Sequence, residues 1–90
     1  MKAAKIMIAH DVHCRRFDEE LVMVDLARGE YFGLNEVGAV VVDHIAAGKT
    51  RDEIIDELTA TFDVDHARAA GDYEALLEEL LSRGLVLPAE

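Results

Sequence analysis

The sequence comprises 90 residues, of which 51% are hydrophobic and 31% are charged. This length fits one domain spanning residues 1–90, and the balance is that of a globular chain rather than a disordered one. The formal net charge is −10, from 19 acidic and 9 basic residues. A field of this sign repels phosphates, so we expect neither nucleic acid nor an anionic membrane surface as a partner.

The sequence also carries no targeting or membrane signal that pattern analysis detects. No apolar run approaches the ~20 residues of a membrane span, and "IMIA" near the N-terminus is far shorter than the apolar core of a secretory signal. Cys14 is the one cysteine, so an intramolecular disulfide is ruled out and a reducing compartment fits. We therefore expect a cytoplasmic protein.

Three short stretches with strand character precede Asn35. They are "HDVHCRRF" (10–17), "ELVMVDL" (20–26) and "EYFGL" (30–34). Gly29 supplies the positive φ that a tight hairpin needs, and Asp18-Glu19 offers a second turn. The pattern predicts a three-stranded antiparallel meander over about 10–34, with residues 20–26 in its centre.

Helical periodicity follows over about 36–83. Asn35 is a favoured N-cap for the first helix, which Gly48 ends, and Thr50 with Glu53 forms a capping box that begins the second. These elements predict an α+β fold, a winged-helix-turn-helix-like arrangement in which a three-stranded antiparallel sheet is followed by three helices.

The third helix has an interrupted pattern at Gly71. Asp65 is a candidate N-cap, but the clear periodicity runs from Asp72 to Arg83. After Gly84, "LVLP" predicts a short final strand that Pro88 stops. The apolar stripe of this helix comprises Tyr73, Leu76, Leu77, Leu80 and Leu81.

A winged-helix arrangement raises the possibility of a DNA-binding regulator. Both candidate reading helices are acidic on their polar faces, which opposes the approach of phosphates. The acidic residues are Asp52, Glu53, Asp56 and Glu57 on the second helix and Asp72, Glu74, Glu78 and Glu79 on the third. We therefore keep DNA binding only as a distant alternative.

The string "HDVHC" is the one candidate metal site. Residues three apart on a strand point to opposite faces, so His10 and His13 diverge; His10 and Cys14 share a face but lie about 13 Å apart at the strand rise. Neither pair chelates one zinc ion. A nucleophilic Cys14 needs a base and an electropositive setting, which the nearby His13 and two arginines make conceivable, but a buried or inert thiol is far commoner. We therefore predict no metal, no cofactor and no catalytic residue.

The strand "EYFGL" lies at an open edge of the predicted sheet. Alternation sends Glu30, Phe32 and Leu34 to one face and Tyr31 with Gly33 to the other. An open edge is either a short strand whose aromatic residues fill the core or a surface kept for a partner strand. The pattern alone leaves both interpretations open.

The sequence resembles the PqqD-like family over about residues 11–87. The resemblance rests on "G-x-Y-F-x-L-N-x-x-G" at Gly29 to Gly38, "G-K-T" before the second helix and "L-x-x-x-G-L-V" near the end. Members of this family are recognition elements for the leader segments of ribosomally made, post-translationally modified peptides. The resemblance implies a winged-helix-like fold of three strands and three helices, with no catalysis.

The resemblance also implies how a partner binds. In this family the leader of a precursor peptide adds as an antiparallel strand to the third strand, in a groove between that strand and the third helix. Asp72 matches a commonly acidic position that engages a basic or hydroxyl group, and which helix-three leucines face the groove is left open. The implied leader-binding residues are Glu30, Tyr31, Phe32, Gly33, Leu34, Asp72, Tyr73, Leu76, Leu77 and Leu80.

Within the family, the sequence looks most like the stand-alone leader-binding proteins of lasso-peptide biosynthesis. The implied partners are the precursor leader peptide, a leader peptidase and a macrocyclase. The alternative is the chaperone of pyrroloquinoline quinone biosynthesis, which serves a radical enzyme, or a protein of another modified-peptide pathway. The quinone type ranks second because it tends to carry a proline-containing segment where this chain has "VDLARGEYF".

Overall fold

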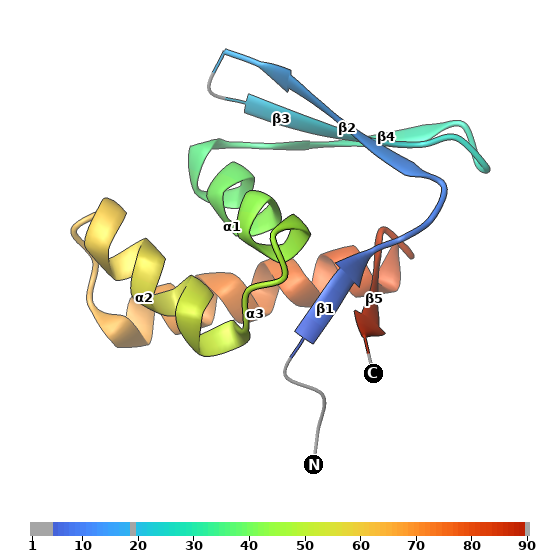
Figure 1. Ribbon diagram of the computed structural model, residues 1–90. Coiled ribbons are helices and arrows are strands. Elements are labelled where there is room, and N and C mark those ends of the chain that lie inside the picture. The colour runs from blue at the N-terminus through green and yellow to red at the C-terminus, as the bar shows by residue number, and fades with distance from the viewer. Residues whose placement is uncertain (1–4, 19, 90) are drawn as a thin grey trace.

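The computed structural model describes residues 5–18 and 20–89, which form two antiparallel sheets and three helices (Figure 1). The elements in chain order are β1 (Lys5–Ile8), β2 (Val12–Phe17), β3 (Glu20–Asp25), β4 (Glu30–Leu34), α1 (Glu36–Ala46), α2 (Arg51–Thr61), α3 (His66–Ser82) and β5 (Val86–Ala89). The three-stranded sheet β2-β3-β4 is followed by all three helices, which confirms the predicted α+β order.

The three-stranded sheet is the predicted meander with β3 in its centre. Gly29 has φ +70°, as the hairpin turn between β3 and β4 requires. Asp25, only 6% exposed, stabilises the same turn because its Oδ1 accepts hydrogen bonds from the backbone N–H groups of Ala27 (3.1 Å) and Arg28 (3.3 Å). At the other hairpin Asp18 has φ +57°, and Glu19 of the predicted turn lies outside the described residues.

A second sheet of β1 and β5 was only half predicted. The sequence patterns give no strand before residue 10, yet β1 pairs antiparallel with β5 through Ile6↔Pro88 and Ile8↔Val86. Pro88 therefore lies within β5 and does not stop it. After β1 the chain makes a turn, in which the N–H of Val12 donates a hydrogen bond to the carbonyl of Ala9 (3.1 Å). Strand β2 therefore begins at Val12, later than the predicted residue 10.

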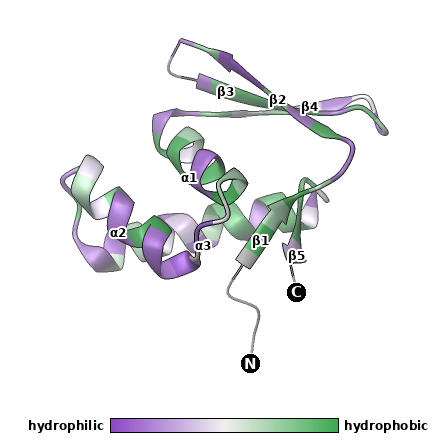
Figure 2. Cartoon of the chain, in the orientation of Figure 1, coloured by the Kyte–Doolittle hydropathy of each residue, from purple (hydrophilic) through white to green (hydrophobic). Residues whose placement is uncertain are grey.

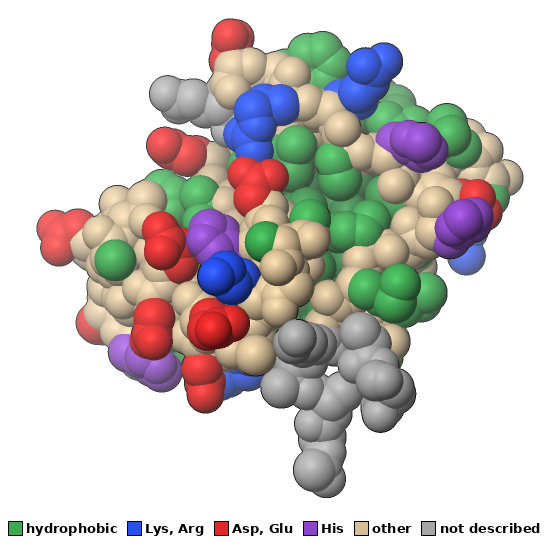
Figure 3. Space-filling model, in the orientation of Figure 1, with side chains coloured by type: hydrophobic (Ala, Val, Ile, Leu, Met, Phe, Trp, Pro, Cys, Tyr) green, Lys and Arg blue, Asp and Glu red, His purple; other side chains and the backbone are tan. Residues whose placement is uncertain are grey.

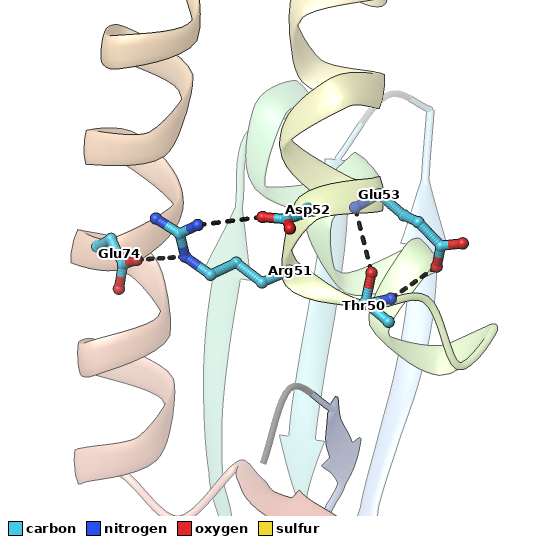
Figure 4. Close-up of polar contacts among 5 residues, drawn as sticks. All are labelled: Thr50, Arg51, Asp52, Glu53 and Glu74. Carbon is cyan, nitrogen blue, oxygen red and sulfur yellow. Dashed lines mark hydrogen bonds and ion pairs between the residues drawn. The ribbon is translucent and has the colours of Figure 1, made fainter. Parts of the chain in front are cut away.

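The first two helices begin where the sequence predicts. The Asn35 side chain accepts a hydrogen bond from the N–H of Gly38 (3.0 Å) at the start of α1. At the start of α2, the Thr50 hydroxyl accepts from the N–H of Glu53 (3.3 Å) and the Glu53 carboxylate accepts from the N–H of Thr50 (2.8 Å) (Figure 4). These bonds satisfy backbone donors that have no partner within a helix.

Helix α3 begins earlier than its clear periodicity predicts. The carboxylate of Asp65 caps it by accepting from the N–H of Arg68 (2.8 Å), and the helix continues through Gly71. A helix-interior glycine costs about 1 kcal/mol relative to alanine. The cap and the alanine-rich stretch "ARAA" (67–70) offset that cost.

The core consists of two clusters that meet at α1, which lies between the three-stranded sheet and the other two helices (Figures 1 and 2). One cluster joins the inner face of the sheet to α1, α3 and β5, and the other joins the three helices. The helices cover one face of the sheet and leave its outer face uncovered (Figure 1). In the described part of the chain, no helix is long and apolar enough to cross a membrane.

Candidate functional site

A groove runs between the edge strand β4, the start of α1 and the first half of α3. Its volume is about 500 Å³. Its walls combine apolar side chains with one acidic and one basic residue. The lining residues are Phe32, Gly33, Leu34, Asn35, Val37, Gly38, Val41, Arg68, Asp72, Ala75 and Leu76.

Strand β4 forms one rim of this groove, and it is an edge strand of the three-stranded sheet. Within the described residues, β3 is its one strand neighbour. On an antiparallel edge strand, alternate residues direct their N–H and C=O groups away from the sheet. The rim therefore presents backbone donors and acceptors next to an apolar hollow.

The predicted alternation of β4 is confirmed by its register with β3. Phe32 pairs with Met23 and Leu34 with Leu21, on the face that packs against the helices. Tyr31, by contrast, is 77% exposed on the outer face. It lines a separate hollow there, so the structure does not place Tyr31 in the groove.

Helix α3 contributes fewer groove residues than its apolar stripe suggests. Leu76 and Asp72 line the groove, whereas Tyr73 and Leu80 are 2% and 0% exposed in the two core clusters. Leu77 is half-buried against both clusters and is not among the lining residues. The open question about the helix-three leucines is thereby answered: Leu76 faces the groove, and Leu80 belongs to the core.

Six lining residues escaped the sequence analysis as site candidates: Asn35, which was predicted only as a helix cap, and Val37, Gly38, Val41, Arg68 and Ala75. The α1 residues among them had been assigned to a helix without a role in the site. Arg68 lies before Asp72, where the clear periodicity of the third helix begins. One signal was available, because residues 68, 72, 75 and 76 share a helix face if α3 begins at the Asp65 cap.

Close packing at Gly38 shapes the groove floor. A Cβ atom at this position would lie 2.8 Å from Cδ2 and 3.1 Å from Cβ of Leu34. Real Cβ atoms do not approach other atoms so closely, so glycine is what lets Leu34 lie against α1. Both residues line the groove, and its depth at this point depends on their contact.

The polar end of the groove is formed by Arg68 and Asp72. Their Nε and Oδ2 atoms lie 3.4 Å apart, one helical turn from each other, with side chains 72% and 49% exposed. An exposed pair of this kind contributes little to stability. It offers a binding chain both a cation and a carboxylate, which suits a basic, acidic or hydroxyl group.

The groove's other end lies near Arg83. The Arg83 guanidinium lies 4.7 Å from the ring centroid of Phe32 and its Nε donates to Glu79 Oε2 at 2.6 Å. The cation therefore stacks on the aromatic ring of a groove residue and is held by a carboxylate. This arrangement restricts the Phe32 ring, which forms part of the groove wall.

The residues of the candidate metal string lie apart. His10 lies in the turn before β2 and not on a strand, so the expected shared face with Cys14 does not exist. His13 pairs with Val24 on the outer face and Cys14 with Met23 on the inner face. Among the residues that the structure describes, no group of three or more His, Cys, Asp or Glu side chains is placed to hold a metal ion.

Cys14 is exposed, but its surroundings make it a weak nucleophile. Partial burial and then the negative charge of Asp43 raise the pKa of the Cys14 thiol. A raised pKa lowers the thiolate fraction at neutral pH, which is the reactive form. The side chain therefore has no sign of activation.

The charges of the surface are mainly acidic, and the arginines are largely paired. Acidic side chains gather over the region of α2 (Figure 3). Arg51 Nε donates to Glu74 Oε2 at 2.7 Å (Figure 4), and Arg16 pairs with Asp43. In the described part of the chain, neither α2 nor α3 carries a row of basic side chains along its surface. The structure therefore keeps the acidic helix faces that argue against binding of either helix to DNA.

Fold and groove together define a class: a small α+β protein with an open sheet edge beside a helix-walled apolar groove. Comparison with known families then identifies it. The family described as coenzyme PQQ synthesis protein D (PqqD) matches residues 20–86, and the chain belongs to this family. No curated protein matches significantly.

Two solved structures are similar over almost their whole length. One is "TbiB1 in Complex with the TbiA(beta) Leader Peptide", with 30% identity and a TM-score of 0.87, covering 93% of this chain and 98% of that chain. The other is "Lasso peptide synthetase B1 complexed with the leader peptide", with 27% identity and a TM-score of 0.87, covering 94% and 100%. Both neighbours are complexes with a leader peptide, and the second is described as a lasso peptide synthetase, which agrees with the resemblance noted in the sequence.

Proposed function

We propose that this protein recognises the leader of a ribosomally made precursor peptide in lasso-peptide biosynthesis. The leader adds as an antiparallel strand to β4 and lays alternate side chains in the groove. One observation carries the proposal: the open edge of β4 is the rim of an apolar groove of about 500 Å³. The protein acts as a binding partner and not as a catalyst.

The two parts of the site supply different components of recognition. Backbone hydrogen bonds to β4 fix the leader as an extended chain and are independent of its sequence. Side chains of the leader that point inward meet Leu34, Val41 and Leu76. Each fully buried apolar side chain contributes about 1.5 to 3 kcal/mol before ordering costs, and micromolar affinity corresponds to about 8 kcal/mol, so two or three anchors reach it only together with the backbone hydrogen bonds to β4.

Polar selectivity is assigned to the Arg68–Asp72 end of the groove. Arg83, which follows α3, lies beside Glu30 and Phe32, so the opposite end of α3, with Arg68 and Asp72, lies toward Leu34 and Asn35 at the C-terminal end of β4. An antiparallel strand runs from there toward Glu30, so the N-terminal part of the leader strand meets Asp72 and Arg68. A hydroxyl or charged group at that part of the leader is the expected partner of this pair.

Strand direction also determines where the rest of the precursor emerges. An antiparallel leader leaves the protein beside Glu30 and the β3–β4 turn. The segment to be modified follows the leader and therefore projects from this end. The leader peptidase and the macrocyclase are the proposed partners that act on the precursor there.

The test is a titration of a labelled leader peptide, taken from the precursor that a small open reading frame near this gene is found to encode. Ala75 lines the groove and is exposed, so Ala75→Glu blocks the groove without disturbing the core. Ala60→Glu is the matched control, since Ala60 is an exposed helix residue outside the groove. We expect micromolar or tighter binding by the native protein, at least a tenfold loss for Ala75→Glu, and no change for Ala60→Glu. Absence of native binding at tens of micromolar, or equal effects of the two variants, contradicts the proposal.

The family description favours one second candidate, the quinone pathway. The same groove serves either role, because the pathways differ in the precursor and the modifying enzymes. Parallel titrations with a lasso leader and with a quinone precursor separate them. We expect preference for the lasso leader, because both similar structures are leader-peptide complexes and one of them is described as a lasso peptide synthetase.

A further inference from the structure

The outer face of the three-stranded sheet has no described helix over it (Figure 1). Its apolar residues include Val22, Val24 and Tyr31, which line a hollow of about 610 Å³ together with Phe17 and Leu26. Phe17 and Tyr31 are 60% and 77% exposed. This hollow is separate from the groove, but both lie along β4, and Gly33 on the outer face of that strand also borders the groove.

The register of the strands sorts this face into rows that run across the sheet. One row is Tyr31–Val24–His13 and the next is Gly33–Val22–Arg15. Tyr31 and Gly33 end these rows at the open edge. A strand added to β4 would extend each row by one residue, because directly paired residues point to the same face.

Gly33 is the exceptional member of its row. Its φ is not in the left-handed region and nothing lies within 4 Å of a Cβ built there, so neither backbone conformation nor packing calls for glycine. Glycine inside a strand weakens the strand and often marks a place where another chain approaches closely. Without a side chain at this position, Val22 is reachable from beyond the edge.

We propose that the bound leader is recognised on its outward side as well, by a bulky apolar residue paired with Gly33. This leader side chain lies across Gly33, contacts Val22 behind it, and flanks Tyr31 in the neighbouring row. An aromatic residue is the preferred class, because aromatic side chains cover glycine on a neighbouring strand and reach diagonal neighbours. The inference rests on the proposed strand addition and adds an outward specificity site to the groove.

The exposed apolar residues of the outer face continue to the open edge of β4. Their position favours a side chain of the bound leader as their partner, over an unrelated protein or a second copy of the chain. The rows that the leader extends are the rows that contain the exposed apolar residues. A leader bound at β4 therefore lies directly beside Tyr31 and Gly33. Its outward side chain would cover apolar surface that the helices leave bare.

The test is a double-mutant cycle between Gly33→Val and an alanine scan of the leader. A valine fits the strand conformation and fills the space that the leader residue would occupy. Arg15→Val is the matched control, because Arg15 belongs to the same row but lies on β2, at the opposite edge of the sheet from β4. Circular dichroism confirms that each variant is folded.

We expect one outward leader position whose alanine substitution lowers affinity about three- to tenfold in the native protein, the range of cross-strand aromatic pairs. Gly33→Val lowers affinity for the native leader by a similar factor and removes the effect of that alanine substitution. Arg15→Val leaves both affinities unchanged. A second readout is a nuclear Overhauser effect between the leader side chain and the Hα protons of Gly33.

Additive effects of Gly33→Val and every leader substitution overturn the inference, even when the leader binds and Ala75→Glu blocks it. Self-association that Tyr31→Ala abolishes, with unchanged leader affinity, also overturns it in favour of a second copy on this face. Failure of the proposed function gives a different result, since the native protein then binds no leader at all.

Discussion

Two helix-interior glycines, Gly38 in α1 and Gly71 in α3, have opposite surroundings. A Cβ at Gly38 would meet Leu34 at 2.8 Å, whereas nothing lies within 4 Å of a Cβ at Gly71. Gly38→Ala is expected to lower the free energy of unfolding by roughly 1–3 kcal/mol through overpacking. Gly71→Ala is expected to raise it by about 0.5–1 kcal/mol, because alanine restricts the unfolded chain. Urea denaturation measures both.

The same two substitutions also test whether Gly38 contributes to leader binding in the groove. Gly38 lines the groove floor and Gly71 does not, so leader affinity should fall for Gly38→Ala and stay constant for Gly71→Ala. If both substitutions changed the free energy of unfolding by the same amount and in the same direction, Leu34 would be able to move away from the new methyl group at position 38 without loss of stability.

Tyr73 provides a test of core packing through pH. Burial and then the charge of Glu74 raise the pKa of the Tyr73 phenol above its ordinary value of 10.0. As pH rises past 10, the unfolded state loses this proton before the folded state does, so the stabilising contribution is complete below pH 10 and declines above it. Tyr73→Phe should therefore lose less stability than the native protein between pH 9 and 11, measured by thermal unfolding. Tyr31→Phe, at an exposed position, is the control and should follow the native curve.

At the scale of elements, local signals predicted most of the fold. The caps at Asn35 and Thr50 and the hairpin glycine Gly29 fix where chain segments begin and end, and each of these signals acts within a few residues. β1 was missed because its four residues show no alternation and its partner, β5, lies at the other end of the chain. A pairing of such long sequence separation leaves no local pattern.

The groove was predictable only in part for a related reason. Alternation correctly placed Phe32 and Leu34 on the helix-facing side of β4. Helical spacing, however, gives one stripe on α3, and it cannot separate Leu76 in the groove from Leu80 in the core. That separation depends on how α3 crosses the sheet, which is a property of packing between elements. The missed residues of α1 enter the site for the same reason.

At the scale of the molecule, the small sheet of β1 and β5 connects the two ends of the chain to the core. Leu85 and Val86 are 3% and 0% exposed, and Ile6 and Ile8 pack against both core clusters. Chain ends are commonly frayed unless such contacts hold them. The packing of β1 therefore stabilises both core clusters. The family match covers residues 20–86 and does not include this strand.

A pair of substitutions in β1 tests whether this end of the chain is docked in solution. Ile8 packs against both clusters, whereas its neighbour Met7 points away and is 48% exposed. Ile8→Ala should lower the free energy of unfolding by roughly 1–3 kcal/mol, because it removes buried methyl groups that the surroundings cannot replace. Met7→Ala should change it by less than about 0.5 kcal/mol, as surface substitutions do. Urea denaturation monitored by circular dichroism measures the difference, and equal effects of the two variants would show that β1 does not contribute its inward face to the core.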